Sequence, residues 1–367
     1  MSGLPRDMEE EVLSRVPVRF LGEVRSTCKK WITLTRSESF LVAKKKQRKG
    51  IEVVMMLNHR VYLMSVDLLS PSIERIGNLN ADGVDISRIF HCDGLILCLI
   101  SKLKHPSRLL VSNPFLGQRK WIEPTSSYQT RLGYDKEKKE HKVLRFVNDY
   151  LRTAKNRGLE LEIYSLHSNS WKAIYEITRK PYWHISAPRP GVSLKGNTYW
   201  YARESIHKAD PPFLLCFDFT AERFGPRLPL PFHGTASDTI SLSSVREEQL
   251  AVLYLKGGAA APTYTVKIWI TSKIEPNGVS WSNLFLAVDL KQLIGHRVCL
   301  FSGNFFLDEE KKVAVVLDIT RGRNIAYVLG NNGYFKPVDL GEYEVGKGTC
   351  WPCVRSYVPS TVQIAPP

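Results

Sequence analysis

Two cysteines near the end of the chain are the first candidates for chemistry. Cys350 and Cys353 have the Cys-x-x-Cys spacing of a redox dithiol or of half a zinc site. A redox dithiol needs a helix that begins after the first cysteine, whereas prolines and a strand-like pattern follow here. A zinc site needs two more ligands, and the sequence has no second Cys-x-x-Cys. We therefore expect Cys353, with Val354 and Tyr357, to lie in a strand that closes the fold beside residues 51–57.

Three potentially reactive residues also occur side by side, at His91, Cys92 and Asp93. They could bind a metal, or Cys92 could act as a nucleophile. Gly94 follows Asp93, however, and Asp-Gly between two apolar runs is typical of a β-hairpin turn, so a structural role is favoured. The sequence contains no Gly-rich phosphate loop, no G-x-S-x-G elbow and no H-E-x-x-H motif. We expect no catalytic residues, no metal and no cofactor.

The composition is that of an ordinary globular protein, with 43% apolar and 24% charged residues. No apolar run approaches the ~20 residues that a membrane helix needs, and the acidic, amphipathic N-terminus lacks the apolar core of a secretory signal. The seven cysteines are scattered and odd in number, which indicates reduced thiols. We therefore expect no membrane partner and a location in the cytoplasm, the nucleus or both.

A net charge of +15 could attract a polyanion. Two stretches carry much of it, residues 44–49 and a looser set over residues 136–157. Because no nucleic-acid-binding motif accompanies the charge, the sequence favours a basic linker and a solvated loop over a nucleic-acid partner.

The elements that would position these residues differ along the chain. Residues 1–42 have apolar positions at helical spacing, with Pro5 suited to a first helical turn and Pro17 expected to end the first helix. This predicts a small domain of three short helices, which must lean on a partner or on the next domain to bury enough surface. A basic linker at residues 43–50 would follow.

After residue 50 the chain consists of short β-branched and aromatic runs, separated by turn residues. A hairpin pattern with one bulky residue recurs about every 50 residues, which is typical of a β-propeller with four strands per blade. Residues 51–367 would hold about six such units, with the bulky residue of each last strand packed between neighbouring blades. An irregular stack of antiparallel sheets is the alternative, and a short helix is possible at residues 284–294. The recurring residues are Ile73, Trp121, Trp171, Phe224, Trp281 and Phe335.

The stretch LPRDMEEEVLSRVPVRFLGEVRSTCKKWITLTRSESF resembles the F-box. It has the Leu-Pro start, the acidic residue, the aliphatic helix and the closing Arg-x-x-Cys-Lys-x-Trp in the family order. Met8, Phe20 and Thr27 depart from the usual residues. The resemblance implies that the domain binds a Skp-type adaptor and, through it, a cullin scaffold. The residues implied to pack the helices or face the adaptor are Leu4, Pro5, Leu13, Pro17, Leu21, Val24, Cys28 and Trp31.

The remainder is similar to the F-box associated interaction domain of plant F-box proteins, a kelch-like repeat region. The segments FHCDGLILCL, LLVSNPFLGQRKWI, EIYSLHSNSW and LLCFDFTAERF carry this resemblance, as does a closing Ser-Tyr-Val-Pro-Ser at residues 356–360. The fold class expected is therefore mainly β with a small α N-terminal domain: a three-helix F-box followed by a kelch-like β-propeller.

The resemblance implies a substrate-recognition subunit of an SCF-type (Skp–cullin–F-box) ubiquitin ligase, which is not itself an enzyme. The propeller would bind an unknown target protein, and its binding residues cannot be read from the sequence. The longest connections are candidates. An alternative is a glycan- or polyanion-binding propeller, or a propeller enzyme, with Tyr182, Trp183 and Trp200 stacking on the ligand. The candidate connections are residues 102–108, 150–158, 180–190, 206–212 and 257–263.

Overall fold

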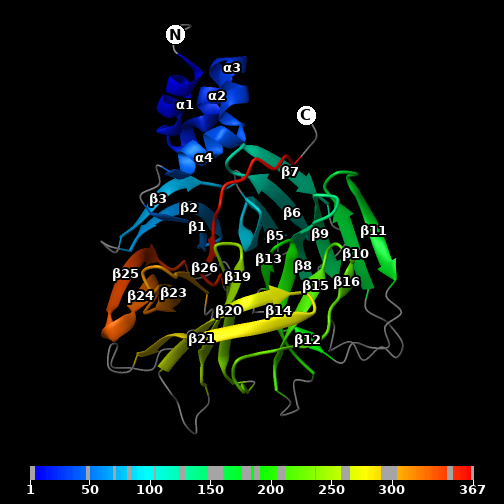
Figure 1. Ribbon diagram of the computed structural model, residues 1–367, viewed down its shortest axis with the longest axis vertical. Helices are drawn as coiled ribbons and strands as arrows, with labels where there is room; N and C mark the ends of the chain where they lie inside the picture. Colours follow the sequence, from blue (N-terminus) through cyan, green and yellow to red (C-terminus); the bar gives the residue numbers. More distant parts are fainter. Residues whose placement is uncertain are drawn as a thin grey trace.

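The fold is known from a computed structural model of the 367-residue chain. In Figure 1 the helices form a small body at one edge of a ring of sheets. The residues described are 5–46, 50–68, 72–80, 84–102, 105–123, 129–146, 160–175, 183–185, 191–204, 211–235, 237–257, 265–290, 304–344 and 350–364.

Four α-helices and one short 3-10 helix form the N-terminal domain. They are α1 (Arg6–Ser14), η1 (Val18–Phe20), α2 (Leu21–Thr27), α3 (Lys29–Thr35) and α4 (Glu38–Lys46). Pro5 and Pro17 occupy the positions just before α1 and η1, where a missing backbone N–H costs nothing. The extended backbone of Cys28, with φ −159°, separates α2 from α3.

Helix α4 adds a fourth helix to the three expected, and it includes residues 43–46 of the stretch expected to be a basic linker; residues 47–49 lie outside the described residues. Phe40 and Leu41 are buried, and their burial favours a helix where the lysine-rich sequence suggested a solvated segment. Lys44 is part of this helix and donates hydrogen bonds to the carbonyl oxygens of Ser14, the last residue of α1, and of Val16 just after it. A cation there stabilises the C-terminal end of α1.

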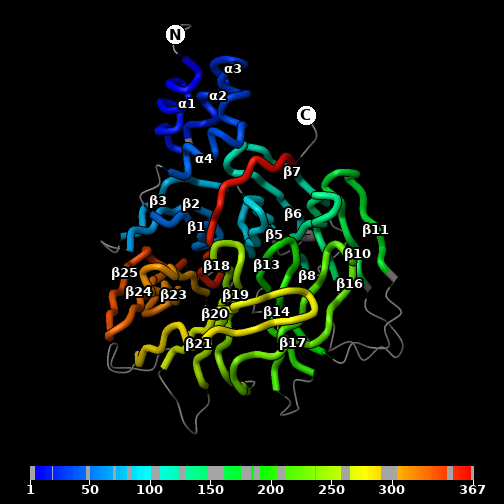
Figure 2. Tube along the Cα trace, in the orientation of Figure 1, coloured from blue at the N-terminus to red at the C-terminus, as the bar shows by residue number. Residues whose placement is uncertain are grey.

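Six antiparallel sheets follow, numbered here as blades 1 to 6 (Figure 2). Blade 4 has six short strands and the other blades have four each, as the repeat predicted. Blade 1 contains β26 (Cys353–Ser356), β1 (Ile51–Leu57), β2 (Arg60–Asp67) and β3 (Ser72–Asn78); blade 2 contains β4 (Ile86–Cys92), β5 (Leu95–Lys102), β6 (His105–Asn113) and β7 (Gln118–Ile122); blade 3 contains β8 (Gln129–Asp135), β9 (Glu140–Phe146), β10 (Glu160–Ser165) and β11 (Ser170–Tyr175); blade 4 contains β12 (His184–Ile185), β13 (Val192–Leu194), β14 (Asn197–Arg203), β15 (Phe213–Asp218), β16 (Arg223–Phe224) and β17 (Leu228–Pro229); blade 5 contains β18 (Thr239–Val245), β19 (Gln249–Leu255), β20 (Thr265–Glu275) and β21 (Gly278–Asp289); blade 6 contains β22 (Phe305–Asp308), β23 (Val313–Thr320), β24 (Arg323–Gly330) and β25 (Phe335–Glu342).

The fold class is thus confirmed as a helical domain followed by a six-bladed β-propeller. All six recurring bulky residues lie on the last strand in the order of their sheets: β3, β7, β11, β16, β21 and β25. Five of them pack into apolar clusters that two neighbouring blades share. Trp121 is the exception: it is 38% exposed, and the Arg108 guanidinium lies 4.6 Å from its ring centre.

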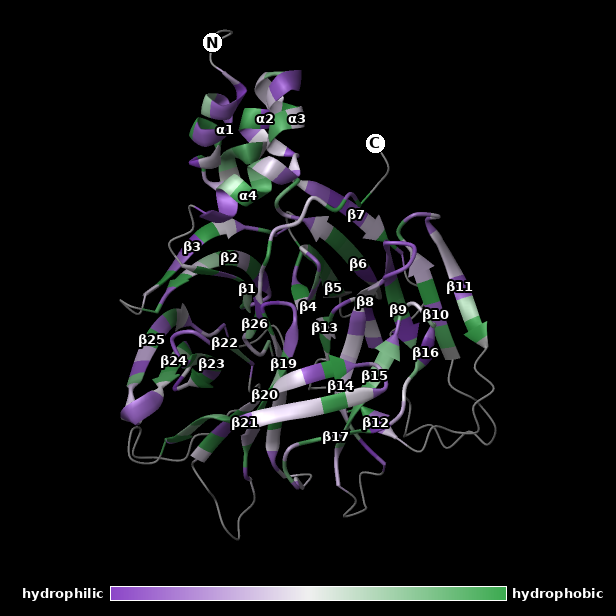
Figure 3. Cartoon of the chain, viewed as in Figure 1, coloured by the Kyte–Doolittle hydropathy of each residue, from purple (hydrophilic) through white to green (hydrophobic). Residues whose placement is uncertain are grey.

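The propeller buries its apolar side chains between blades rather than within each one. Six clusters each combine residues of two adjacent blades, and green apolar stretches run along inner strands such as β2 and β5 in Figure 3. A blade alone would leave both faces of its sheet exposed, so the ring must be closed to be stable.

The last strand closes the ring, as expected for Cys353 and Val354. Strand β26 pairs antiparallel with β1, with Val354 opposite Met55 and Cys353 opposite Met56. Tyr357, expected in the same strand, lies just after it and is 2% exposed. The tail then crosses blade 2, where the Asn113 side-chain amide donates to the carbonyl oxygens of Ser360 and Val362 at 3.0 and 2.8 Å.

The helix considered possible at residues 284–294 is a strand over its described part. Strand β21 runs to Asp289 and pairs with β20. Leu286, Val288 and Leu290 are buried whereas Ala287 and Asp289 between them are exposed, which is a period of two rather than a helical period. Residues 291–294 lie outside the described residues.

Candidate functional site

The His91–Cys92–Asp93 segment is structural. Asp93 and Gly94 form the turn between β4 and β5, both with positive φ, as an Asp-Gly hairpin requires. The Nε2 atom of His91 accepts a hydrogen bond from the backbone N–H of Gly94 at 3.2 Å, and burial lowers the pKa of this imidazole to about 4. Burial also raises the pKa of the Cys92 thiol well above its usual range, so the thiolate that a nucleophile needs is disfavoured.

Cys350 and Cys353 are both free thiols, 3% and 6% exposed. Burial raises the pKa of each thiol, which is the opposite of what a redox dithiol needs. The Sγ atom of Cys350 accepts a hydrogen bond from the backbone N–H of His59 at 3.1 Å. Both side chains belong to the apolar cluster between blades 1 and 2, where they help to hold the closing strand.

In the described part of the chain, no three His, Cys, Asp or Glu side chains are grouped so that they could hold a metal ion. Over the same residues, no helix has the length and apolar character needed to cross a membrane.

The helical domain carries an exposed apolar stripe. Met8 and Val12 of α1 are 55% and 58% exposed, and they lie one helical turn apart on the same face. Pro5, one turn before Met8, is also exposed. Phe20, at the start of α2, is 40% exposed. Large apolar side chains left in water on so small a domain indicate a surface for a protein partner.

The core of the same domain is completed by the propeller. Leu13, Leu21, Leu34 and Phe40 pack with Phe115 and Leu116, which lie in the turn between β6 and β7. Phe115 is fully buried, and its ring centre lies 6.3 Å from that of Phe40.

A buried arginine strengthens this junction. The Arg25 guanidinium lies 5.7 Å from the centre of the Phe115 ring and donates to the Thr35 hydroxyl and carbonyl oxygens at 3.0 and 3.1 Å. The hydrogen bonds hold α2 to α3, and the contact of the cation with the Phe115 ring links these helices to blade 2.

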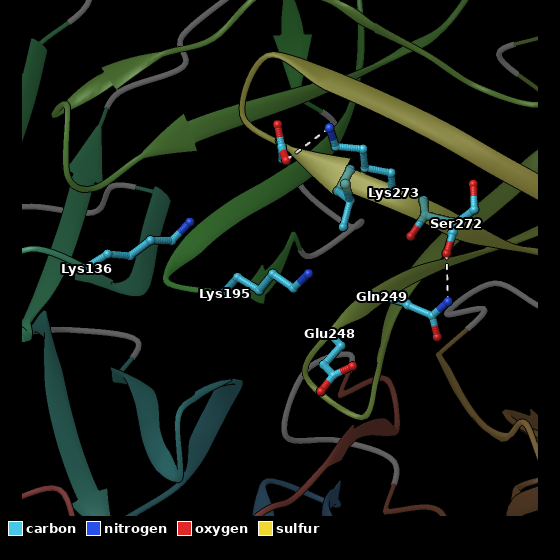
Figure 4. A pocket seen from close by; sticks show the side chains of 9 residues that line it. Lys136, Lys195, Glu248, Gln249, Ser272 and Lys273 are labelled. Carbon is cyan, nitrogen blue, oxygen red and sulfur yellow. Dashed lines mark hydrogen bonds and ion pairs between the residues drawn. The ribbon is translucent and has the colours of Figure 1, made fainter.

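A polar pocket of about 410 Å³ lies on the propeller, where three blades meet (Figure 4). Lys136 comes from the β8–β9 turn, Lys195 from the β13–β14 turn and Glu248 from the β18–β19 turn. Residues 271–275 of β20 form the opposite wall. The β8–β9 and β18–β19 turns join the first and second strands of blades 3 and 5, and the β13–β14 turn joins the second and third strands of blade 4.

Known proteins resemble the chain over its whole length. Residues 1–43 match the F-box domain, and residues 52–364 match the F-box associated beta propeller domain. An F-box/kelch-repeat protein of Arabidopsis thaliana is 50% identical, covering 99% of each chain. A second Arabidopsis F-box protein is 48% identical, covering 99% of this chain and 98% of its own.

The chain belongs to the F-box proteins with an F-box associated β-propeller.

Among solved structures, TolB from Acinetobacter baumannii is similar over 89% of this chain and 72% of its own, with 12% identity and a TM-score of 0.47. So low a score supports no conclusion about function.

The structure divides the eight residues implied to pack the F-box or face the adaptor. Leu13 and Leu21 are 5% and 0% exposed and belong to the F-box core, so a partner cannot reach them directly. Val24 and Trp31 are half-buried against the same core. Pro5, Pro17 and Cys28 are exposed. Leu4 lies outside the described residues.

Met8, Val12 and Phe20 were not among the implied adaptor-binding residues. Met8 and Val12 are among the apolar positions at helical spacing in the sequence, and Met8 and Phe20 also depart from the usual family residues. The sequence signal for an exposed apolar face is that Pro5, Met8 and Val12 recur at helical spacing on the side of α1 away from Leu13. Sequence periodicity could have placed them on one face, but could not say which face is exposed.

The candidate target-binding connections lie largely outside the described residues. The polar pocket beside β20, called the pocket under β20 below, is lined by short turns instead of these connections. The only sequence feature that pointed to it is the basic stretch that begins at Lys136. Two of the three aromatic residues suggested for stacking on a ligand are packed inside the propeller. Trp200 is fully buried against Phe146, Trp183 packs on Phe224 with ring centres 4.8 Å apart, and Tyr182 lies outside the described residues.

Proposed function

We propose that this F-box protein is the substrate-recognition subunit of an SCF-type ubiquitin ligase. In this role the F-box binds a Skp-type adaptor, the adaptor connects to a cullin scaffold, and the propeller binds the protein to be ubiquitinated. F-box domains generally bind Skp-type adaptors, and the family to which the chain belongs supports the same role.

The observation that carries the proposal is the exposed stripe of Met8 and Val12, with Phe20 at the start of α2. Each of these side chains is at least 40% exposed, although the F-box core beneath them is already filled by Leu13, Leu21 and Phe40. An adaptor that covered the stripe would remove apolar surface from water, at about 25 cal/mol per Å². A few such side chains can carry most of the binding energy of an interface.

The chain itself would catalyse nothing. Its contribution would be proximity: holding the target on the same assembly as the conjugating enzyme raises the effective concentration of target lysines. The contact of Phe115 with the F-box core supports this role, because a fixed orientation between F-box and propeller would keep the bound target in one place. We also propose that the protein works in the cytoplasm, the nucleus or both.

The alternative is a glycan- or polyanion-binding propeller or a propeller enzyme. Of its aromatic candidates, Trp200 is buried, Trp183 is half-buried against Phe224, and Tyr182 lies outside the described residues. In the described part of the chain, no observation favours glycan binding or catalysis.

Co-purification tests the proposal. The full chain, produced with a plant Skp-type adaptor, is expected to form a stable complex. Met8→Asp with Val12→Asp should weaken the complex at least tenfold, since two charges would be placed in an apolar contact, each costing roughly 1–2 kcal/mol. Val42→Asp is the control and should bind normally, because Val42 is an exposed valine of α4, the helix that lies next to the propeller in Figure 1. No complex with the unaltered chain, or equal losses in both variants, would contradict the proposal.

A further inference from the structure

The pocket under β20 is built by a strand pair that departs from the regular blade. Strands β20 and β21 have 11 and 12 residues, and their register shifts at three places between Ile268 and Lys273. Such irregularities bend a strand pair and re-aim its side chains. Figure 1 shows this pair, the β20–β21 arm, extending across towards blade 4, and the Trp281 indole N–H donates to the Pro229 carbonyl oxygen there at 2.9 Å.

The two turns that carry Lys136 and Lys195 are fixed to one another. The Tyr134 backbone N–H donates to the Gly196 carbonyl oxygen at 3.0 Å. A Cβ atom at Gly196 would lie 2.7 Å from the Tyr134 carbonyl oxygen, and Gly196 has a φ of +79°, so only glycine fits this approach. The backbone N–H of Lys136 also donates to the Thr220 hydroxyl at 3.0 Å. The two lysines therefore start from backbone positions that are set before any ligand arrives.

The charges in the pocket are unevenly distributed. Lys273 is paired with Glu275 at 3.3 Å on the arm. In the described part of the chain, Lys136 and Lys195 form no ion pair, and Figure 4 shows both side chains extending the same way from neighbouring turns. Glu248 lies across from them in the same view. Two ammonium groups with no ion pair among the described residues and one carboxylate thus line the same pocket.

We propose that this pocket binds an anionic side chain, a carboxylate or a phosphate, on an extended segment of the target protein. The inference rests on the proposed role of the propeller as target receptor. Lys136 and Lys195 would hold the anion together from two blades, and Glu248 would disfavour a second anion at the other end. The volume of about 410 Å³ is within the ~300–1,000 Å³ typical of ligand sites, which suits a few side chains of a peptide.

The test uses three fluorescein-labelled octapeptides and the full chain in complex with its adaptor. The first alternates Glu and Ser, the second alternates Gln and Ser, and the third is the second with one phosphoserine. The first, the third or both should bind more tightly than the neutral second peptide. A difference between the first and third would show whether carboxylate or phosphate is preferred.

Two double variants that change the net charge by the same amount show whether the peptide binds in the pocket. Lys136→Glu with Lys195→Glu changes the pocket, while Lys138→Glu with Lys139→Glu changes exposed lysines of the β8–β9 turn that do not line it. Each pair includes one position with positive φ, Lys195 or Lys139, so the backbone cost is matched. The pocket pair should weaken anionic-peptide binding at least tenfold and the control pair by less than twofold. Glu248→Gln should strengthen it.

Equal losses in the two pairs would show attraction to net charge alone and would overturn the proposal, as would no preference for the anionic peptides. The proposal would also be overturned, in favour of a nucleic-acid ligand, if binding of a single-stranded oligonucleotide depended on Lys136 and Lys195 more strongly than binding of the peptides does. Adaptor capture is measured on the same preparations. Loss of adaptor binding in the unaltered chain would contradict the ligase role but leave the peptide result readable, since the two sites lie on different domains.

Discussion

The F-box and the propeller bury their apolar side chains in different ways. The propeller has six clusters, each shared by two blades, and the pairing of β26 with β1 completes the circle. The F-box has one cluster, and Phe115 and Leu116 of blade 2 belong to it. A domain of about 40 residues buries too little surface to be stable alone, so borrowing side chains from the propeller solves a problem of size.

The two regions also offer different surfaces to partners. The F-box presents exposed apolar side chains at Met8 and Val12 of one helix, whereas the propeller presents a polar pocket assembled from several turns. A short helix can carry a recognition surface within a few residues of sequence. A pocket on a propeller needs residues far apart in the chain, and therefore needs the whole ring to be closed.

The largest effect is expected from breaking the ring. Val354→Asp places a charge at a fully buried position of β26, in the cluster that blade 1 shares with blade 6. An unpaired buried charge costs about 3–5 kcal/mol or more, so the propeller should lose its cooperative thermal transition. Because the F-box depends on blade 2, adaptor binding should fall as well. Val12→Asp, at an exposed valine, is the control for thermal stability, measured by calorimetry. A normal transition in Val354→Asp would show that β26 is dispensable.

Phe115→Ala should destabilise the F-box without destabilising the propeller. Removing a buried phenylalanine costs about 3–5 kcal/mol, and Phe115 belongs to the F-box cluster only. Hydrogen exchange should therefore show faster exchange in α2 to α4 with unchanged protection in the six blades. Trp121→Ala, in the next strand of the same blade but 38% exposed, should change little. If the F-box amides keep their protection, the F-box does not depend on the propeller.

A smaller effect concerns a buried carboxyl group of the propeller. Burial raises the pKa of Asp318 on β23 to about 7, from a usual value of 3.8. The folded state then holds a proton that the unfolded state releases, so this group lowers stability as pH rises from about 4 to 7. Asp318→Asn should remove the penalty, raising the melting temperature by a few degrees at pH 8 and by little at pH 4. An equal shift at both pH values would point to packing instead of charge.

The smallest functional effect is expected at the cysteines. Cys350→Ser with Cys353→Ser should lower stability by about 1–2 kcal/mol, since two buried thiols become hydroxyls. Zinc content, measured by atomic emission, and adaptor capture should both be unchanged. Stoichiometric zinc in the unaltered chain that is lost in this variant would revive the metal-site hypothesis.

Much of the fold could be predicted because its signals are local or periodic. The recurrence of Trp121, Trp171 and Phe224 predicted the last strands of three blades. The prediction of a last strand is correct for Trp121 even though this side chain is exposed. The closing strand at Cys353 followed from a strand pattern at the end of the chain. Helix α4 was missed because its lysines resemble a linker, and only the burial of Phe40 and Leu41 against other helices and blade 2 makes it helical.

The sequence by itself determined the family, the helical domain, a repeat of about 50 residues and the absence of familiar catalytic motifs, because each depends on residues close together or regularly spaced. Only the tertiary structure decided which apolar residues of α1 are buried, so Leu13 became core and Met8 and Val12 became surface. It alone brought Lys136, Lys195 and Glu248 from three blades around one pocket. The physical reason is that burial and proximity are properties of packed neighbours, and these neighbours lie tens to hundreds of residues apart along the chain.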